Sequence, residues 1–303
     1  MSDVSHAGVT VSDLDRSIWY YGELLGMEQK RRYVSNIDLA RPMWNSPSLE
    51  QVESCLVQMP NSEQQIQLVQ ATGQFGPARQ RGARTKAEGH LWDIGNAHFG
   101  FRVDDLEVTV ARLGEHGFIP LSGEIVRGEA QYADLKVVYV PDPDGFYIEL
   151  VEWTASPDGF DDTHAGITVS DLERSLWYYR DILGMELLRR YPGDVALTRA
   201  LWNAPEVQSL EVALLAMPGQ VQHVELRQVR GLPQNRIQHK QWDVGFSHVS
   251  LAVPDLERLV GKLAEAGIAP RAYLRGEGLT NSFVANSHIP DPDGFDLELI
   301  QVG

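Results

Sequence analysis

The sequence predicts an α+β fold made of four consecutive βαβββ units, with curved mixed sheets around a cleft. Three observations support this prediction. Residues 6–21 return almost letter for letter as residues 164–179. Each copy contains a second, weaker unit of the same pattern, and short extended segments follow one amphipathic helix in each unit. Because self-similarity at a fixed spacing marks repeated structural units, we infer a duplication.

Composition limits the classes of protein to consider. At 303 residues the chain is long enough for about two domains. The 26 basic and 42 acidic residues leave a formal charge of −16, which argues against a nucleic-acid partner. No apolar run reaches the roughly 18 residues of a membrane span, and no secretory signal is visible, so we expect a cytoplasmic protein. A homodimer is compatible with these properties. The single cysteine, Cys55, is expected in the core.

The first unit begins with a strand and a helix. Residues 6–11 alternate between apolar and polar side chains, as in a strand with one buried face. Ser12 and Asp15 resemble a capping box, and Gly26 ends a helix whose apolar residues recur at helical spacing. Extended segments follow at residues 29–34, 52–59 and 65–70, with a loop at 43–47 between the first two.

The same elements recur along the chain. The third unit repeats the first, with Ser170 and Glu173 as the capping box, extended segments at 187–191, 210–217 and 222–229, and a loop at 201–205. The second unit has a strand at 98–103, a helix at 105–116 and a last strand at 146–152, and the fourth has these at 248–253, 255–266 and 295–301. A P-D-P-D-G turn precedes each of these last strands, at 141–145 and 290–294.

We therefore predict two tandem domains separated by a linker. The boundaries are residues 1–153 for the first domain (units 6–71 and 97–153), 154–163 for the linker, and 164–303 for the second domain (units 164–229 and 247–303). The linker is rich in Pro, Gly, Ser and Asp, which is typical of a connection between domains.

Each unit opens with a histidine and closes with a strand that has one polar residue between apolar neighbours. The opening residues are His6, His98, His164 and His248, and the closing ones are Gln67, Glu149, Glu225 and Glu298. Because side chains alternate along a strand, histidine and closing residue share the face opposite the core. Imidazole and carboxylate groups on one face could bind Zn, Ni, Co, Mn or Fe(II), or they could line a solvated cleft without a metal.

These residues resemble the vicinal oxygen chelate superfamily, which includes glyoxalases, methylmalonyl-CoA epimerases and extradiol dioxygenases. The similarity rests on the repeated H-A-G-x-T-V-S-D-L-x-R-S segment and on the closing D-P-D-G-F segment. It implies two glyoxalase-like domains in which two facing units hold one divalent metal ion between their opening and closing residues.

The resemblance leaves the pairing of the units open. Pairing within each half would give one site of His6, Gln67, His98 and Glu149 and a second of His164, Glu225, His248 and Glu298. Pairing the first unit with the fourth would give a site of His6, Gln67, His248 and Glu298.

Three functions follow from the resemblance. The first is a metal-dependent lyase or isomerase acting through a metal-bound enediolate or enolate, with Glu149, Glu225 or Glu298 as base or simply as ligand, and Tyr139 as a donor. The second is an Fe(II) extradiol dioxygenase, for which the histidine expected near residues 130–132 is missing. The third is a non-catalytic small-molecule binding or resistance protein. Trp92 and Trp242 either wall the cleft or pack in the aromatic core. If they wall the cleft, an apolar or aromatic small-molecule substrate is favoured.

Overall fold

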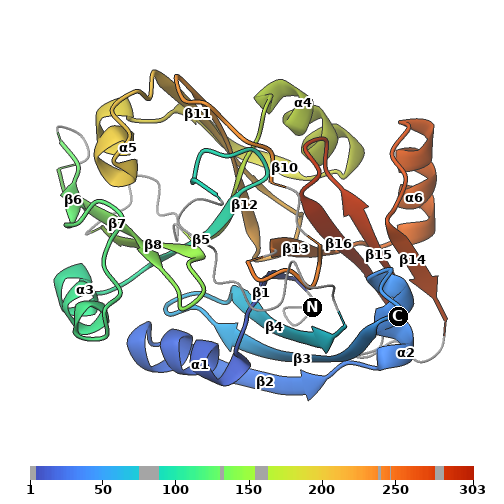
Figure 1. Cartoon of the computed structure of the whole chain (residues 1–303). Coiled ribbons are helices and arrows are strands. Elements are labelled where there is room, and N and C mark those ends of the chain that lie inside the picture. Colours follow the sequence, from blue (N-terminus) through green and yellow to red (C-terminus); the bar gives the residue numbers. More distant parts are fainter. Residues whose placement is uncertain are drawn as a thin grey trace.

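The structure is a computed structural model, in which residues 5–74, 89–129, 133–153, 163–237, 240–245, 247–276 and 283–303 are described. It confirms the predicted α+β class: within these residues the chain forms two mixed eight-stranded sheets with few helices (Figure 1). Most of the predicted linker, residues 154–162, lies outside the described residues.

The first and third units contain the same series of elements. In the first these are β1 (His6–Thr10), α1 (Leu14–Trp19), the π-helical turn η1 (Tyr20–Leu24), β2 (Glu28–Val34), α2 (Ile37–Met43), β3 (Leu49–Gln58) and β4 (Gln65–Gly73). In the third they are β9 (His164–Thr168), α4 (Leu172–Leu176), η3 (Trp177–Ile182), β10 (Glu186–Pro192), α5 (Val195–Trp202), β11 (Ser209–Ala216) and β12 (His223–Arg230).

The second and fourth units are simpler. The second consists of β5 (Ala97–Arg102), α3 (Leu106–Glu115), β6 (Val126–Arg127), β7 (Leu135–Pro141) and β8 (Tyr147–Trp153). The fourth consists of β13 (Ser247–Ala252), α6 (Leu256–Glu265), β14 (Ala272–Arg275), β15 (Phe283–Pro290) and β16 (Asp296–Val302).

Each sheet combines one unit from each half of the sequence. The strand orders are β14-β15-β16-β13-β1-β4-β3-β2 and β10-β11-β12-β9-β5-β8-β7-β6. The first unit therefore pairs with the fourth through β1·β13 (Figure 1). The second pairs with the third through β5·β9, and both pairs are antiparallel. This resolves the pairing that the sequence left open, and the boundary between the sequence halves does not coincide with that between the sheets.

The register of the central strand pairs places a glycine opposite three of the four opening histidines. Gly8 pairs with His248, Gly166 with His98, and Gly100 with His164. A Cβ atom on Gly166 would lie 1.8 Å from Cε1 of His98, which real atoms cannot do. The glycine two residues after the first histidine of each half thus makes room for the imidazole of the opposite unit.

The predicted capping boxes are wrong, although the helices are where they were expected. Asp13 and Asp171 are the N-caps, with side chains that accept hydrogen bonds from the backbone N–H groups three residues on. Ser12 instead binds Asp144 of the other sheet, through its backbone N (2.8 Å) and its Oγ (2.5 Å). Ser170 makes the equivalent bonds to Asp293. The serines therefore join the sheets rather than cap the helices.

The tyrosines of the repeated segment make a second contact between the sheets. In the turn η1 both Tyr20 and Tyr21 are fully buried, and their hydroxyls donate to the Pro141 carbonyl (3.0 Å) and to Asp142 (3.1 Å). The third unit makes the matching contacts to the turn before β16. Each repeated segment thus holds the D-P-D-G turn of its own half.

The predicted loops at 43–47 and 201–205 begin inside helices. Met43 is the last residue of α2, and Trp202 is the last residue of α5. Asn36 and Asp194 cap the two helices with their side chains, a signal that was not recognised in the sequence. The helices matter because each of them covers one of the cavities described below.

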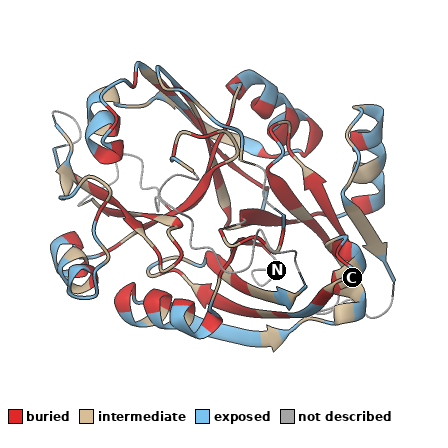
Figure 2. Cartoon of the chain, viewed as in Figure 1, coloured by how far each residue is buried: buried red, intermediate tan, exposed pale blue. Residues whose placement is uncertain are grey.

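The core runs between the two sheets and their helices. One cluster of buried apolar side chains includes members of all four units, such as Val9, Phe99, Ile167 and Leu251. Cys55 is fully buried in this cluster, as predicted. Figure 2 shows buried residues along the strands and exposed ones on the outer sides of the helices. Among the described residues, no helix has the length and apolar character needed to cross a membrane.

Candidate metal centres

Two cavities lie against the faces of the sheets that bear the opening histidines. Cavity A, of about 140 Å³, lies on the sheet of the first and fourth units, and α2 contributes Leu39 and Met43 to its wall. Cavity B, of about 200 Å³, lies on the sheet of the second and third units, and α5 contributes Leu201 and Trp202. The predicted site residues thus meet in two places, each supplied by both halves of the chain.

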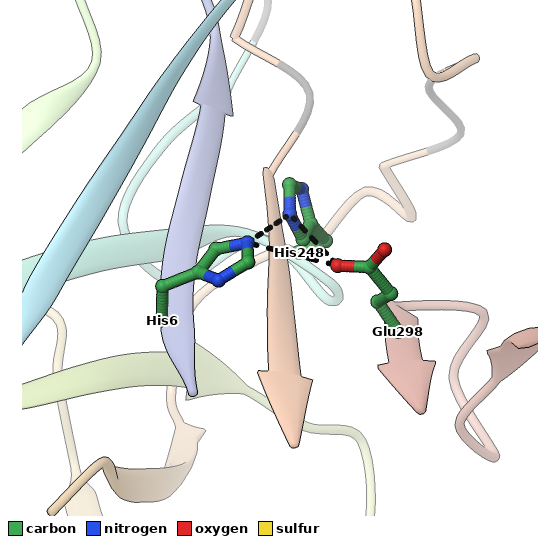
Figure 3. Close-up of side chains that lie close together, drawn as sticks. All are labelled: His6, His248 and Glu298. Carbon is green, nitrogen blue, oxygen red and sulfur yellow. Dashed lines mark hydrogen bonds and ion pairs between the residues drawn. The ribbon is translucent and has the colours of Figure 1, made fainter. Parts of the chain in front are cut away.

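In cavity A, two histidines and one glutamate converge (Figure 3). The Nε2 atoms of His6 and His248 lie 3.4 Å apart. Glu298 Oε2 lies 3.6 Å from Nε2 of His6 and 3.9 Å from Nε2 of His248. Gln67 is the fourth predicted residue, and its amide nitrogen donates to the hydroxyl of Tyr33 at 2.6 Å. Gln67 therefore lines the cavity with its amide nitrogen bound to Tyr33.

Further polar residues hold Glu298 from behind. Asn286 donates to its Oε1 at 2.7 Å, and His288, which is 2.5 Å from Asp296, lies 3.9 Å from the same oxygen. Burial opposes ionisation of Glu298, but its histidine neighbours outweigh that effect and hold its pKa at about 2. Burial lowers the pKa of His248 to about 4, so both groups are in the metal-binding state at neutral pH.

In cavity B, His98, His164 and Glu149 form the corresponding group. The two Nε2 atoms lie 3.1 Å apart, and Glu149 Oε2 lies 3.0 Å from that of His98 and 3.4 Å from that of His164. Glu225 is the fourth predicted residue; its Oε1 lies 3.9 Å from His164 Nε2 and outside the group of three. Cavity B therefore has a second carboxylate where cavity A has an amide.

Tyr139 and Arg227 complete cavity B. The Tyr139 hydroxyl donates to Glu149 Oε2 at 2.8 Å and accepts from Arg227 Nη1 at 3.0 Å. Burial opposes ionisation of Glu149, but hydrogen bonds from His164 and His98 hold its pKa well below the usual range. Burial raises the pKa of Glu225 above its usual value.

The donor distances in cavity B, 3.0–3.4 Å, fit a divalent transition metal, whereas in cavity A the carboxylate lies farther from the two imidazoles, at 3.6 and 3.9 Å. Ligands about 2.1 Å from such an ion lie roughly 3.0–3.4 Å apart at angles of about 90–110°, and the imidazole nitrogens are 3.4 Å apart in cavity A and 3.1 Å in cavity B. Burial lowers the pKa of His98 to about 3, with a further contribution from Arg227, so its imidazole is neutral. Two imidazoles and one carboxylate match the donors that such metals prefer.

Seven of the eight predicted ligand residues line these cavities, and the eighth, His98, is fully buried with its Nε2 3.1 Å from that of His164. The sets are not those that pairing within each half would give. Of the two alternatives for Trp92 and Trp242, the cleft wall is not found, because neither lines cavity A or cavity B. Trp92 stacks on His90 and packs beside Trp202. Trp242 lines a neighbouring surface groove instead of cavity A.

Sequence reasoning missed several residues of the cavities. Tyr33 and Asn286 in cavity A and Arg227 in cavity B were not predicted. The signal for Arg227 was present, because it lies two positions after Glu225 and must share its face of β12. No comparable signal marks Asn286, since it depends on the pairing of β15 with β16.

Comparisons with known proteins agree with this fold. Two family models, both described as the Glyoxalase/Bleomycin resistance protein/Dioxygenase superfamily, match residues 5–154 and 163–299. Among solved structures, glyoxalase I from Zea mays is 21% identical, with a TM-score of 0.61 over 98% of this chain and 92% of that one. That likeness shows a shared fold.

The chain is also similar to curated proteins that are named lactoylglutathione lyases. A protein named "Probable lactoylglutathione lyase, chloroplastic" from Arabidopsis thaliana is 27% identical over 61% of this chain and 45% of its own length. A second Arabidopsis protein, named lactoylglutathione lyase, is 26% identical over 61% of this chain and 56% of its own length. This chain therefore spans about half the length of these relatives.

Proposed function

Because the chain belongs to the Glyoxalase/Bleomycin resistance protein/Dioxygenase superfamily, we propose that it is a divalent-metal-dependent lyase or isomerase of the glyoxalase type, working at cavity B. The names of its curated relatives support a lyase. One observation favours cavity B over cavity A. Glu225 lies beside the group of three donors and not within it, whereas the corresponding Gln67 has no carboxylate.

The roles of the residues follow from this arrangement. His98, His164 and Glu149 would hold the ion, which supplies Lewis-acid chemistry by polarising a carbonyl or hydroxyl oxygen of the substrate. Glu225 removes a proton from the carbon bonded to the oxygen-bearing carbon. It then returns this proton to the oxygen-bearing carbon itself. Burial raises the pKa of Glu225, which makes it a stronger base. Tyr139 fixes the orientation of Glu149 through its hydrogen bond.

Elemental analysis and activity of two matched variants test this proposal. His98→Ala removes a donor from cavity B, and His248→Ala removes the equivalent donor from cavity A. We expect His98→Ala to lose the metal of cavity B together with turnover of lactoylglutathione, measured by thioester absorbance. His248→Ala should keep that turnover. Unchanged metal content in both variants, or full activity of His98→Ala, would contradict the proposal.

A second candidate is ring cleavage by an Fe(II) dioxygenase at cavity A, whose lining has Gln67 where cavity B has a second carboxylate. His6, His248 and Glu298 form a two-histidine, one-carboxylate group, the arrangement that non-haem iron oxygenases use. Residues 130–132, where the sequence lacks the expected histidine, lie outside the described residues. Oxygen uptake with catechol after Fe(II) loading, lost in Glu298→Gln, would support this candidate. If the protein binds small molecules but holds no metal in either cavity, it is a binding protein and not an enzyme of either kind.

A further inference from the structure

Cavity B contains a buried cation that the proposed metal site does not use. Arg227 is 2% exposed and lines the cavity from β12, two positions beyond Glu225. Its guanidinium carbon lies 5.3 Å from the centre of the Trp202 ring. Removing a charged group from water costs several kcal/mol unless hydrogen bonds replace those to water. An arginine in this place therefore requires an explanation.

The hydrogen bonds of Arg227 are incomplete. Of its three nitrogens, only Nη1 has a short bond, to the Tyr139 hydroxyl at 3.0 Å. Nη2 lies 3.4 Å from the Leu91 carbonyl and 3.4 Å from Thr168 Oγ1, at the long limit for a hydrogen bond. Nε has no hydrogen-bond partner among the described residues, and its distance to Glu225 Oε1 is 3.7 Å. The guanidinium thus has donor capacity left beside the three-donor group.

The fold itself does not require an arginine at this position. Gln67 and Glu225 are equivalent in the repeat, so the residue of cavity A that corresponds to Arg227 is Val69. Val69 lines cavity A and is buried to a similar degree, at 3% exposed. An apolar side chain therefore suits the same place in the same kind of sheet. The cation distinguishes what the two cavities can bind.

We propose that Arg227 recognises the carboxylate of the ligand of cavity B, which would be a carbonyl or hydroxyl compound with an anionic head and an apolar body. A guanidinium can donate two parallel hydrogen bonds to a carboxylate, and Nη1 and Nη2 of Arg227 together make only one short bond. Side chains such as Leu210, Val212 and Leu214 form an apolar wall for the rest of the molecule. This inference rests on the proposed function for the carbonyl or hydroxyl group of the ligand. The preference for a carboxylate can be measured by binding alone, without turnover.

The charges in cavity B agree with an anionic ligand. Glu149 and Glu225 contribute two negative charges, and Arg227 contributes one positive charge. A divalent ion at the three-donor group would leave a net charge of about +1 in the partly open cavity, and one carboxylate neutralises it. A neutral ligand would leave that charge unbalanced.

Calorimetric binding of two probes of the same shape tests the inference. Phenylglyoxylate carries a carboxylate where acetophenone carries a methyl group. We expect wild type to bind phenylglyoxylate more tightly than acetophenone. Arg227→Gln should weaken phenylglyoxylate binding by about 10- to 150-fold, the range for losing a hydrogen bond to a charged group, and should leave acetophenone binding unchanged. Arg227→Lys, which keeps the charge, should retain part of the preference.

Arg189→Gln is the matched control, because Arg189 lines the same cavity but its guanidinium lies over the Tyr191 ring at 4.8 Å. This variant should keep the preference for the carboxylate. The inference is wrong if wild type shows no preference, if Arg227→Gln keeps it, or if Arg189→Gln loses as much. Thermal unfolding of each variant checks that the fold is retained.

The two proposals can fail separately. Titration of the metal-loaded protein with phenylglyoxylate measures carboxylate recognition without turnover, because this probe has no hydrogen on a carbon next to its carbonyl group for Glu225 to remove. A preference that depends on Arg227, together with full activity of His98→Ala, would refute the proposed function and keep this inference. If His98→Ala loses metal-dependent turnover while wild type binds both probes equally, the proposed function is supported and this inference is refuted.

Discussion

At the scale of single residues, the two cavities differ most at the position of Gln67 and Glu225. Both side chains lie next to a tyrosine of the second strand of their unit, Tyr33 in cavity A and Tyr191 in cavity B. An amide can neither take up a proton at neutral pH nor add a negative charge. The two side chains thus have similar surroundings, but only Glu225 can accept a proton.

Replacing Glu225 by Gln should separate proton transfer from metal binding. Since Glu225 lies outside the group of three donors, Glu225→Gln should keep its metal while its turnover falls by roughly 10²- to 10⁴-fold, the usual contribution of a general base. Metal content and kcat measured on one preparation check this. Gln67→Glu is the matched control and should not change turnover. An active Glu225→Gln would assign the proton transfer to another group.

The sequence was sufficient to find the residues that carry the candidate chemistry, but not their neighbours. His6 and Glu298 could be located because each stands at a fixed place in a repeated pattern of strand and turn. Asn286, which holds Glu298, belongs to no pattern of this kind. Its role depends on which strand lies beside β16, a fact of the folded sheet.

At the scale of elements, the central strand pairs position the histidines. Gly166→Ala would place a Cβ atom 1.8 Å from Cε1 of His98, so the imidazole must move. We expect metal affinity at cavity B to fall by about 10- to 100-fold, as when the support of a ligand is lost. Titration with Zn²⁺ in a competing chelator measures this.

Gly114→Ala in α3 is the control for this change. No atom lies within 4 Å of the added Cβ, so metal affinity should stay unchanged. Alanine in a helix should also stabilise the fold by up to about 1 kcal/mol. Equal metal affinity in Gly166→Ala and wild type would show that the His98 imidazole can avoid the added Cβ and still bind metal.

Asp142, in the turn before β8, should make the stability of the fold depend on pH. Burial, and then the charge of Asp144, raise the pKa of Asp142 to about 7 from 3.8. Between these two values the folded state binds a proton that the unfolded state has released. Stability is therefore lost as the pH rises through this window, by at most about 1.4 kcal/mol per pH unit.

Asp142→Asn removes this contribution while keeping an oxygen that can accept from the backbone N–H groups of Asp144 and Phe146. We expect its free energy of unfolding in urea to depend less on pH than that of wild type between about pH 4 and 7. Identical slopes for the two proteins would mean that Asp142 is ionised in the folded state throughout this range.

Element prediction succeeded where the signal was local and failed where tertiary contacts decided. The helix from Leu14 was found from its apolar spacing and from Gly26, whose φ of 74° confirms the glycine stop. Ser12 and Asp13 are both capable caps, and the choice fell on Asp13 because Ser12 binds Asp144. That partner is 132 positions away and leaves no trace in a local pattern.

At the scale of the whole molecule, two sets of contacts cross each other. The sheets join the first unit to the fourth and the second to the third. The contacts of Ser12 with Asp144 and of Ser170 with Asp293 join the units within each half. The pairing could not be read from the sequence, because β1 presents the same H-x-G pattern to either candidate partner. Neither half completes a sheet or a cavity of this structure without the other.

Expressing the two halves as separate chains tests this interdependence. Residues 1–153 and 164–303, co-expressed with a tag on one of them, should co-purify in a 1:1 ratio and bind metal as the intact chain does. Each half alone would expose the edges of β1 and β5 or of β9 and β13, so it should aggregate or associate with itself. A half that is monomeric and metal-loaded would show that the crossed pairing is dispensable.

The crossed pairing also bears on how such a chain can change by mutation. In a dimer of two identical subunits, one altered codon changes both sites at once. Here the codon for residue 67 reaches only cavity A and the codon for residue 225 reaches only cavity B. Joining the copies in one gene therefore lets one cavity keep an ancestral activity while the other acquires a new one, without losing the sheet that both copies build.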